Sequence, residues 1–128
     1  MTLALGGHPL PLVLRSDGRV EAVGQPGTLL GMQTDLSLRD HSAKLSPGDA
    51  LVLYTDGLTE AYAPERIVKG AELAAALGSC AGRSAREIRS GLEDAVLHAG
   101  TSELRDDIVV LVLRVAERSD RPAESDGR

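Results

Sequence analysis

The sequence predicts one α+β domain built in layers, and the order of its segments indicates this class. Short apolar runs of β-type composition fill the first half, two helical patterns follow, and one last apolar run comes after them. Doubly wound folds instead alternate strands with helices. The chain has 128 residues, the size of one typical domain of about 100–150 residues. Residues 116–128 combine mixed charge with Pro and Ser, so we expect a domain at 1–115 and a disordered tail.

Composition and charge exclude several classes of function. The chain is 42% hydrophobic and 26% charged, has no Phe or Trp, and carries a net charge of −5. We therefore expect no nucleic-acid binding, which uses basic surfaces and aromatic stacking. One cysteine, Cys80, excludes an internal disulfide. The sequence has no long apolar run and no basic leader, so we expect no membrane association and a cytoplasmic location.

The first half is predicted to be β structure. Residues 11–15 (PLVLR) and 19–23 (RVEAV) flank Ser16-Asp17-Gly18, and an Asp-Gly turn between two such runs is typical of a β-hairpin. The same half contains two further strand candidates, at 2–5 and 36–45, a loop at 25–31 and a turn at 46–49 (SPGD).

Two continuous apolar runs predict strands that are covered on both faces. Residues 50–54 (ALVLY) and 107–115 (DIVVLVLRV) lack the alternation of a half-exposed strand. Two helices provide the cover. Ser84-Ala85-Arg86-Glu87 is a capping box that begins a helix with one apolar face, ending by Gly100. An Ala-rich helix is expected at about 70–77.

Acidic residues at the ends of these two apolar runs are candidate metal ligands. Asp56 follows the run at 50–54, and the Asp106–Asp107 pair opens the last run. Mg²⁺ and Mn²⁺ prefer oxygen ligands such as carboxylates. Gly57 has no side chain beside Asp56, so water or substrate can approach closely. Taken alone, each pattern is more often a simple turn or an acid that protects a strand from aggregation.

Four segments in the right order resemble the C-terminal half of the PPM family of metal-dependent protein serine/threonine phosphatases, and most closely its bacterial sporulation and stress-response branch. They are 6–20 (GGHPLPLVLRSDGRV), 27–32 (GTLLGM), 46–61 (SPGDALVLYTDGLTEA) and 103–115 (ELRDDIVVLVLRV). The resemblance covers about residues 2–115. It implies two packed antiparallel β-sheets flanked by α-helices, of which 1–115 are the C-terminal portion.

The resemblance also implies a chemistry and its residues. A binuclear Mg²⁺ or Mn²⁺ centre activates a water that hydrolyses phosphoserine or phosphothreonine on a protein substrate. Asp56 and Asp106 match metal ligands, Gly57 matches the close-approach glycine, and Asp107 stands beside the ligands. Successive strand residues point to opposite faces, so the two acids cannot serve one metal centre equally. The resemblance selects Asp106, which we expect to matter more than Asp107 for metal affinity.

The implied partner is a phosphorylated protein, such as an anti-sigma factor antagonist in a bacterial partner-switching pathway. The family's N-terminal half carries a Gly-Asp-x-x-Gly-His-Gly motif whose Asp bridges both metals, and this sequence has none. The alternative is therefore a non-catalytic remnant that acts as a binding module. Exposed apolar strands such as 108–113 also predict self-association through sheet edges. Because the bridging carboxylate is missing, we expect the chain by itself to be inactive.

Four other reactive side chains are expected to lie outside the metal site. We expect His8 to be structural in a tight loop, with a role in the site as the less favoured alternative. We expect His41 to be solvated and His98 to stabilise the end of a helix. Cys80 is expected to be a free thiol without a catalytic role.

Overall fold

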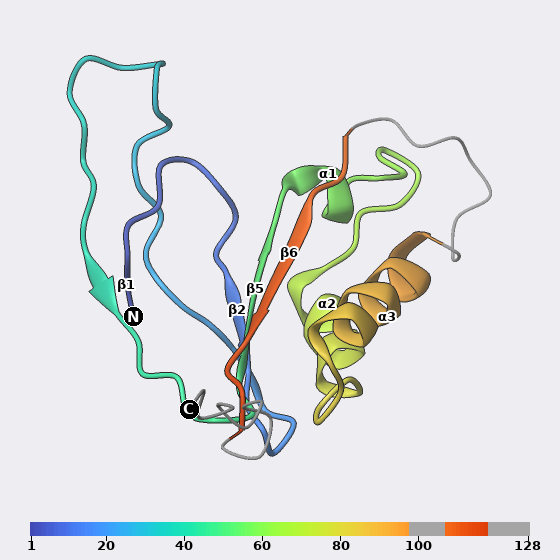
Figure 1. Cartoon of the computed structure of the whole chain (residues 1–128). Coiled ribbons are helices and arrows are strands. Elements are labelled where there is room, and N and C mark those ends of the chain that lie inside the picture. Colours follow the sequence, from blue (N-terminus) through green and yellow to red (C-terminus); the bar gives the residue numbers. More distant parts are fainter. Residues whose placement is uncertain (98–106, 118–128) are drawn as a thin grey trace, which may run out of the picture.

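The computed structural model describes residues 1–97 and 107–117 (Figure 1). In chain order the elements are β1 (Thr2–Leu3), β2 (Leu12–Leu14), β3 (Val20–Ala22), β4 (His41–Ser42), β5 (Ala50–Tyr54), α1 (Asp56–Thr59), α2 (Gly70–Gly78), α3 (Ala85–Leu97) and β6 (Val110–Arg114). They form a four-stranded sheet of order β3-β2-β5-β6 and a two-stranded sheet of β1 and β4. All the strand pairs are antiparallel. The predicted α+β class with two antiparallel sheets is confirmed.

Local turn chemistry builds the β2–β3 hairpin as the sequence predicts. Leu14 pairs with Val20 across it. The backbone N–H of Gly18 donates to the carbonyl oxygen of Arg15 at 2.9 Å, and Gly18 has a φ of +90°. Glycine is favoured there because a positive φ is costly for other residues.

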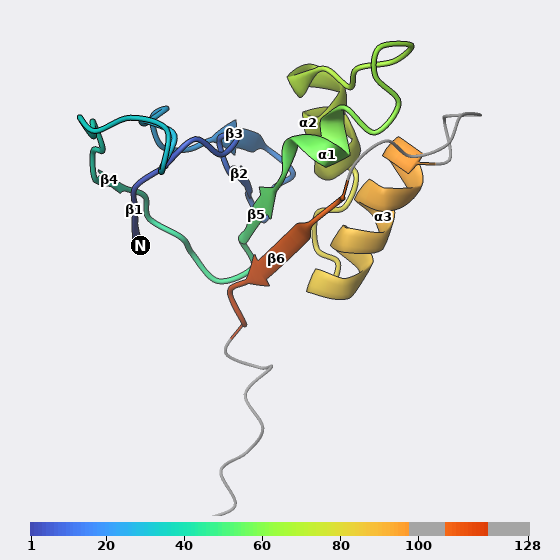
Figure 2. The ribbon, with the colours of Figure 1, turned by 90° about the horizontal axis from the view of Figure 1, so that it is seen from above.

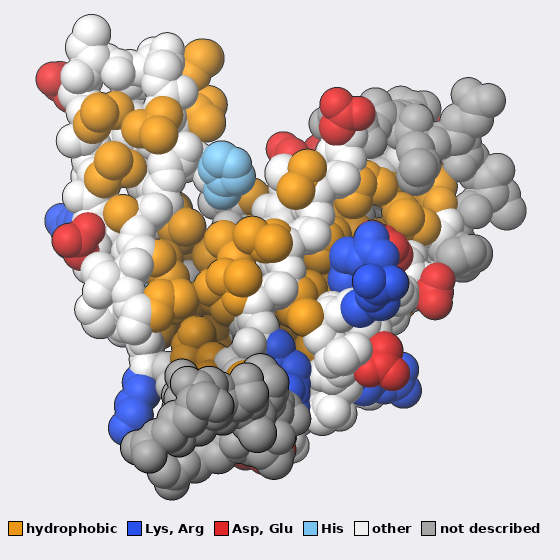
Figure 3. Space-filling model, in the orientation of Figure 1, with side chains coloured by type: hydrophobic (Ala, Val, Ile, Leu, Met, Phe, Trp, Pro, Cys, Tyr) orange, Lys and Arg blue, Asp and Glu red, His pale blue; other side chains and the backbone are white. Residues whose placement is uncertain are grey.

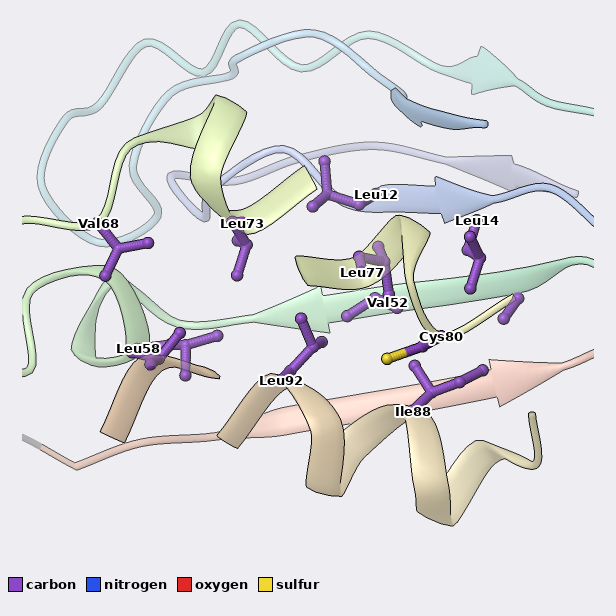
Figure 4. Packing of buried hydrophobic residues seen from close by; sticks show 12 residues of the cluster. Leu12, Leu14, Val52, Leu58, Val68, Leu73, Leu77, Cys80, Ile88 and Leu92 are labelled. Atoms are coloured by element: carbon purple, nitrogen blue, oxygen red, sulfur yellow. The ribbon is translucent and has the colours of Figure 1, made fainter. Parts of the chain in front are cut away.

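Helices α2 and α3 cover one face of the four-stranded sheet (Figure 2). The capping box begins α3 as predicted: the Ser84 N–H donates to Glu87 Oε2 at 2.9 Å, and the Glu87 N–H donates to Ser84 Oγ at 3.3 Å. Buried side chains from the sheet and both helices form the main core (Figure 4). The members are Leu12, Leu14, Ala50, Val52, Leu58, Val68, Leu73, Leu77, Cys80, Ile88, Leu92 and Val96.

The small β1–β4 sheet covers only part of the opposite face. Val13, Val23 and Leu51 are buried there, with Leu3 and Ala43 packed against them. On β6 and just before it, by contrast, Val109, Leu111 and Leu113 are 57%, 51% and 52% exposed. Figure 3 shows hydrophobic side chains in the hollow between the two sheets. The prediction that the last strand is covered on both faces is therefore wrong for the described part of this chain.

Every predicted strand except 50–54 is shorter than expected, and the segments at 36–45 and 107–115 shorten most. Within 36–45 only His41 and Ser42 form a strand, because Ser37 bonds locally to Thr28 instead, with Ser37 N–H donating to Thr28 Oγ1 at 2.8 Å. Within 107–115 the strand covers Val110–Arg114. Residues 118–128 of the expected tail lie outside the described residues. In the described ranges, no helix combines the length and apolar character needed to cross a bilayer.

A buried carboxylate joins the turn at 46–49 to the β2–β3 hairpin. Asp49 is 2% exposed. It accepts hydrogen bonds from Ser46 N–H at 2.9 Å, Ser16 N–H at 3.0 Å and Arg15 Nη1 at 2.8 Å. Burial disfavours the charged form, but these donors outweigh it and hold the pKa of Asp49 below its ordinary value.

We expect Asp49→Asn to lower the free energy of unfolding at pH 7 by about 2 kcal/mol, because an amide N–H₂ replaces one accepting oxygen and leaves a buried donor without its acceptor. Arg15 keeps its ion pair with Glu21. A lowered folded pKa gives stability that is present above the unfolded pKa and is lost as the pH falls through the folded pKa. The variant should therefore lose less stability on acidification than the unmodified chain. Urea unfolding from pH 7 to the acid range measures both effects. Asp40→Asn, at an exposed position, is the control, and equal stability of the two variants would contradict the prediction.

The exposed face of β6 predicts self-association. An apolar strand at the end of a sheet offers both side chains and backbone groups to another chain. We expect the chain to be oligomeric by size-exclusion chromatography with light scattering, and Leu111→Lys/Leu113→Lys to shift it toward monomer. Leu36→Lys, at a 56% exposed position away from β6, should leave the oligomer unchanged. A monodisperse monomer of the unmodified chain would refute the prediction.

Candidate metal-binding site

Asp56 lies just beyond β5, as the first residue of α1. The preceding Thr55 is extended, with φ −96° and ψ 160°. The Asp56 carbonyl oxygen accepts the Glu60 N–H at 2.8 Å and Thr59 Oγ1 at 3.1 Å. The backbone is thus fixed while the Asp56 side chain remains exposed. The expected Asp-Gly turn is in fact one helical turn, where an acid in the first position is favourable.

Thr55 connects this segment to the chain that leads into β6. Its N–H donates to the Val109 carbonyl oxygen at 3.1 Å. Its hydroxyl accepts the Val109 N–H at 3.1 Å and donates to the Asp107 carbonyl oxygen at 3.5 Å. Because β5 and β6 are antiparallel neighbours, the end of one lies beside the start of the other. The two predicted acidic segments are therefore brought together at one end of the sheet.

Gly57 is the point at which the two segments touch. A Cβ atom at Gly57 would lie 2.2 Å from the Asp107 carbonyl oxygen and 3.0 Å from its carbonyl carbon. The sequence predicts that water or substrate occupies the space beside Gly57. The structure fills it with the backbone of Asp107, so the missing side chain allows two chain segments to pack.

Two of the predicted acidic residues, Asp56 and Asp107, lie within the described part of the chain. Asp56 and Asp107 both have exposed side chains, and their carboxylate oxygens are of the type that Mg²⁺ and Mn²⁺ prefer. Asp106, the second predicted ligand, lies outside the described residues, as does His98. Within 1–97 and 107–117, no group of three or more His, Cys, Asp or Glu side chains could hold a metal ion. The donor chemistry of Asp56 and Asp107 fits such a metal.

The structure adds His8 to this end of the sheet. A cavity of about 210 Å³ is lined by Gly7, His8, Pro9, Leu29, Thr55 and Asp56. β2 runs antiparallel to β5, with Leu12 opposite Val52. The loop before β2 and the loop after β5 therefore meet. The structural role of His8 in a tight loop is the favoured prediction, but the antiparallel pairing of β2 and β5 places this loop beside Asp56.

His41 and Cys80, which are also predicted to lie outside the metal site, lie away from Asp56. His41 is half-buried on β4, opposite Leu3. The Cys80 thiol is 2% exposed and lies 3.5 Å from the Ala76 carbonyl oxygen. Neither residue lines the cavity that contains Asp56.

We expect Gly57→Ala to disrupt the site, because its methyl group cannot fit against the Asp107 backbone. The segment before β6 would have to move, at a cost of about 2 kcal/mol in the free energy of unfolding. Calorimetry should show at least about tenfold weaker Mn²⁺ binding than the unmodified chain, a loss of about 1.4 kcal/mol. Gly70→Ala, where nothing lies within 4 Å of an added Cβ, is the control. Unchanged stability and metal affinity in Gly57→Ala would show that the contact is dispensable.

Comparisons with known proteins agree with this geometry. The family model for stage II sporulation protein E (SpoIIE) matches residues 1–116. Phosphoserine phosphatase RsbU from Bacillus subtilis is 27% identical over 114 residues, which cover 88% of this chain and 34% of RsbU. The chain thus spans about a third of that relative's length.

Solved structures show the same fold. The phosphatase domain of the cell fate determinant SpoIIE from Bacillus subtilis, presoaked with Mn, matches with a TM-score of 0.71 at 20% identity, covering 91% of this chain and 50% of that one. A structure of the SpoIIE PP2C phosphatase domain with a fragment of its regulatory domain matches with a TM-score of 0.73 at 20% identity, covering 90% of this chain and 33% of that one. The structure of the RsbU and RsbW domains of Rv1364c from Mycobacterium tuberculosis matches with a TM-score of 0.67 at 32% identity, covering 90% of this chain and 32% of that one. The predicted resemblance to a portion of a PPM-type phosphatase domain is confirmed, and the chain belongs to the stage II sporulation protein E (SpoIIE) family.

Proposed function

We propose that this chain is part of a metal-dependent hydrolase that removes phosphate from phosphoserine or phosphothreonine on a protein substrate. The observation that carries the proposal is the exposed Asp56 side chain, held in the first turn of α1 beside the Gly57–Asp107 contact. RsbU, which is named as a phosphoserine phosphatase, supports the reaction type. Because the chain spans 34% of RsbU, the activity of the whole relative comes to this chain only as a proposal.

Asp56 and Asp106 would hold Mg²⁺ or Mn²⁺, with Asp107 beside them. Such an ion supplies an activated water and neutralises phosphoryl charge when it is bound. The chain's own residues orient this arrangement. Thr55 and Gly57 fix the distance between the two acidic segments, and the cavity of about 210 Å³ above Thr55 and Asp56 leaves room for a phosphoryl group.

The proposed substrate is a phosphorylated protein, and an anti-sigma factor antagonist is the partner we favour. The solved Rv1364c structure contains RsbU and RsbW domains in one protein. This supports a bacterial partner-switching pathway as the setting, with the reaction in the cytoplasm. The acidic composition, with a net charge of −5, favours a protein partner over nucleic acid.

A non-catalytic binding module is the second candidate function. It is favoured by one observation: the described ranges 1–97 and 107–117 bring no three potential metal ligands together. In that case the family fold would be used to hold a partner without turnover. Metal binding and turnover separate the two candidates.

The first test is Mn²⁺ binding by the chain itself. We expect Asp56→Asn to weaken binding at least about tenfold in calorimetry, because it removes a charged ligand from the site. Asp35→Asn, an exposed acid in the loop after β3, should bind like the unmodified chain. Equal affinities in Asp56→Asn and Asp35→Asn would remove Asp56 from the metal site.

Turnover is tested in a hybrid protein that adds the N-terminal half of a SpoIIE-family phosphatase domain with its Gly-Asp-x-x-Gly-His-Gly motif. The hybrid should hydrolyse a phosphoserine peptide with Mn²⁺, and Asp56→Asn should abolish this while the circular dichroism spectrum stays unchanged. A folded hybrid that binds Mn²⁺ and the peptide without turnover would instead support the binding module.

A further inference from the structure

We propose that His8 is a substrate-contacting residue whose imidazole donates a hydrogen bond to a phosphoryl oxygen. The proposal rests on the proposed function, because it assumes that the cavity beside Asp56 receives the phosphoryl group. It adds a residue that lies far from the acidic segments in the sequence. Three observations carry it: the place of His8 among the cavities, the loop that fixes it, and the other side chains around it.

His8 lies where three neighbouring cavities meet. The first, of about 210 Å³, contains Asp56 and Thr55. The second, of about 170 Å³, is lined by His8 with Leu53, Tyr54, Thr55, Val109 and Leu111. The third, of about 260 Å³, also includes His8 and is lined mainly by apolar side chains and Pro residues. His8 therefore stands between an acid-lined cavity and the apolar hollow along β5 and β6, which is visible in Figure 3.

The loop that carries His8 has little freedom to move away. Gly7 has a φ of +94°, and a Cβ atom there would lie 2.3 Å from Leu29 Cδ1 and 2.9 Å from Leu29 Cα. The Leu30 N–H also donates to the Gly6 carbonyl oxygen at 3.5 Å. On the other side of His8, the ring of Pro9 restricts the backbone. The backbone at His8 is thus held in place although its side chain is exposed.

The chemistry of the cavity leaves His8 as the available donor. Among the described residues that line the 210 Å³ cavity, only His8 has a side-chain nitrogen. The Thr55 hydroxyl is engaged with Val109 N–H and the Asp107 carbonyl oxygen. The Asp56 carboxylate repels phosphate unless a cation lies between them. A phosphoryl group carries several oxygen acceptors, and an imidazole N–H suits such an acceptor.

The same placement predicts how a phosphopeptide lies. With the phosphoryl group in the acid-lined cavity, a residue next to the phosphoserine reaches the cavity formed by Leu53, Val109 and Leu111. We therefore expect a peptide with an apolar residue beside its phosphoserine to bind more tightly than one with a charged residue there.

The proposal is tested by NMR titration of the chain with a phosphoserine peptide at saturating Mg²⁺. The His8 imidazole signals should shift on addition of peptide, and His8→Ala should bind about tenfold more weakly, as expected for the loss of one hydrogen bond to a charged group. His8→Gln keeps an N–H donor and should recover most of the affinity. His41→Ala is the matched control and should bind like the unmodified chain. Mg²⁺ affinity, measured separately by calorimetry, should be the same in all four proteins.

Several other results would overturn the proposal. Unchanged peptide affinity in His8→Ala, or an unmodified chain that binds Mg²⁺ but not the peptide, would overturn the proposal while leaving the proposed metal site standing. A parallel loss of Mg²⁺ affinity in His8→Ala would also overturn it, since His8 would then be a metal ligand. A chain that binds no Mg²⁺ would refute the metal site proposed at Asp56, and the inference with it. If His8→Ala lowers the melting temperature, the peptide affinity of His8→Gln is compared with that of the unmodified chain. Similar affinities support the proposal, and a tenfold loss in a stably folded His8→Gln overturns it.

Discussion

The pairing of β5 with β6 brings the segments that carry Asp56 and Asp107 to one end of the sheet. Its five residue pairs run from Ala50 opposite Arg114 to Tyr54 opposite Val110. Beyond the end of this ladder, the backbone N–H and the hydroxyl of Thr55 form hydrogen bonds with the backbone of Val109. Asp56 and Asp107 become neighbours because each is the continuation of one of these strands. The hydrogen bonds of the sheet therefore fix the proximity of the two segments that carry Asp56 and Asp107.

Strand β2 brings a third loop to the same end of the sheet. β2 pairs with β5 on the side away from β6, and the Gly7-His8-Pro9 loop enters β2 at the end where β5 leaves the sheet. Three loops distant in sequence thus converge at one end of three adjacent strands. Helix α1 provides Asp56 and Gly57 at this end, whereas buried side chains of α2 and α3 pack against one face of the sheet. The core and the site are separate regions that share β2 and β5.

What could be predicted from the sequence was set by local chemistry. The Ser16-Asp17-Gly18 turn, the Ser84–Glu87 capping box and the apolar run of β5 each specify their own conformation within a few residues. The contact of Gly57 with Asp107 could not be predicted in this way, because it depends on strand pairing across the sheet. The meeting of His8 with Asp56 is of the same non-local kind. The assignment of Asp56 and Asp106 to a metal came from family resemblance and stays a prediction, with Asp106 outside the described residues.

The exposed face of β6 has a consequence for the electrostatics of the site. Leu111 is 51% exposed and also lines the cavity that His8 shares with Thr55. Any protein layer that packs on this face also becomes a wall of that cavity and removes water from it. Charges and hydrogen bonds in a region of lower dielectric constant interact more strongly. Covering a hydrophobic surface would thus strengthen the attraction between an ion held at Asp56 and the negative charge of a phosphoryl group, without moving a single side chain of the site.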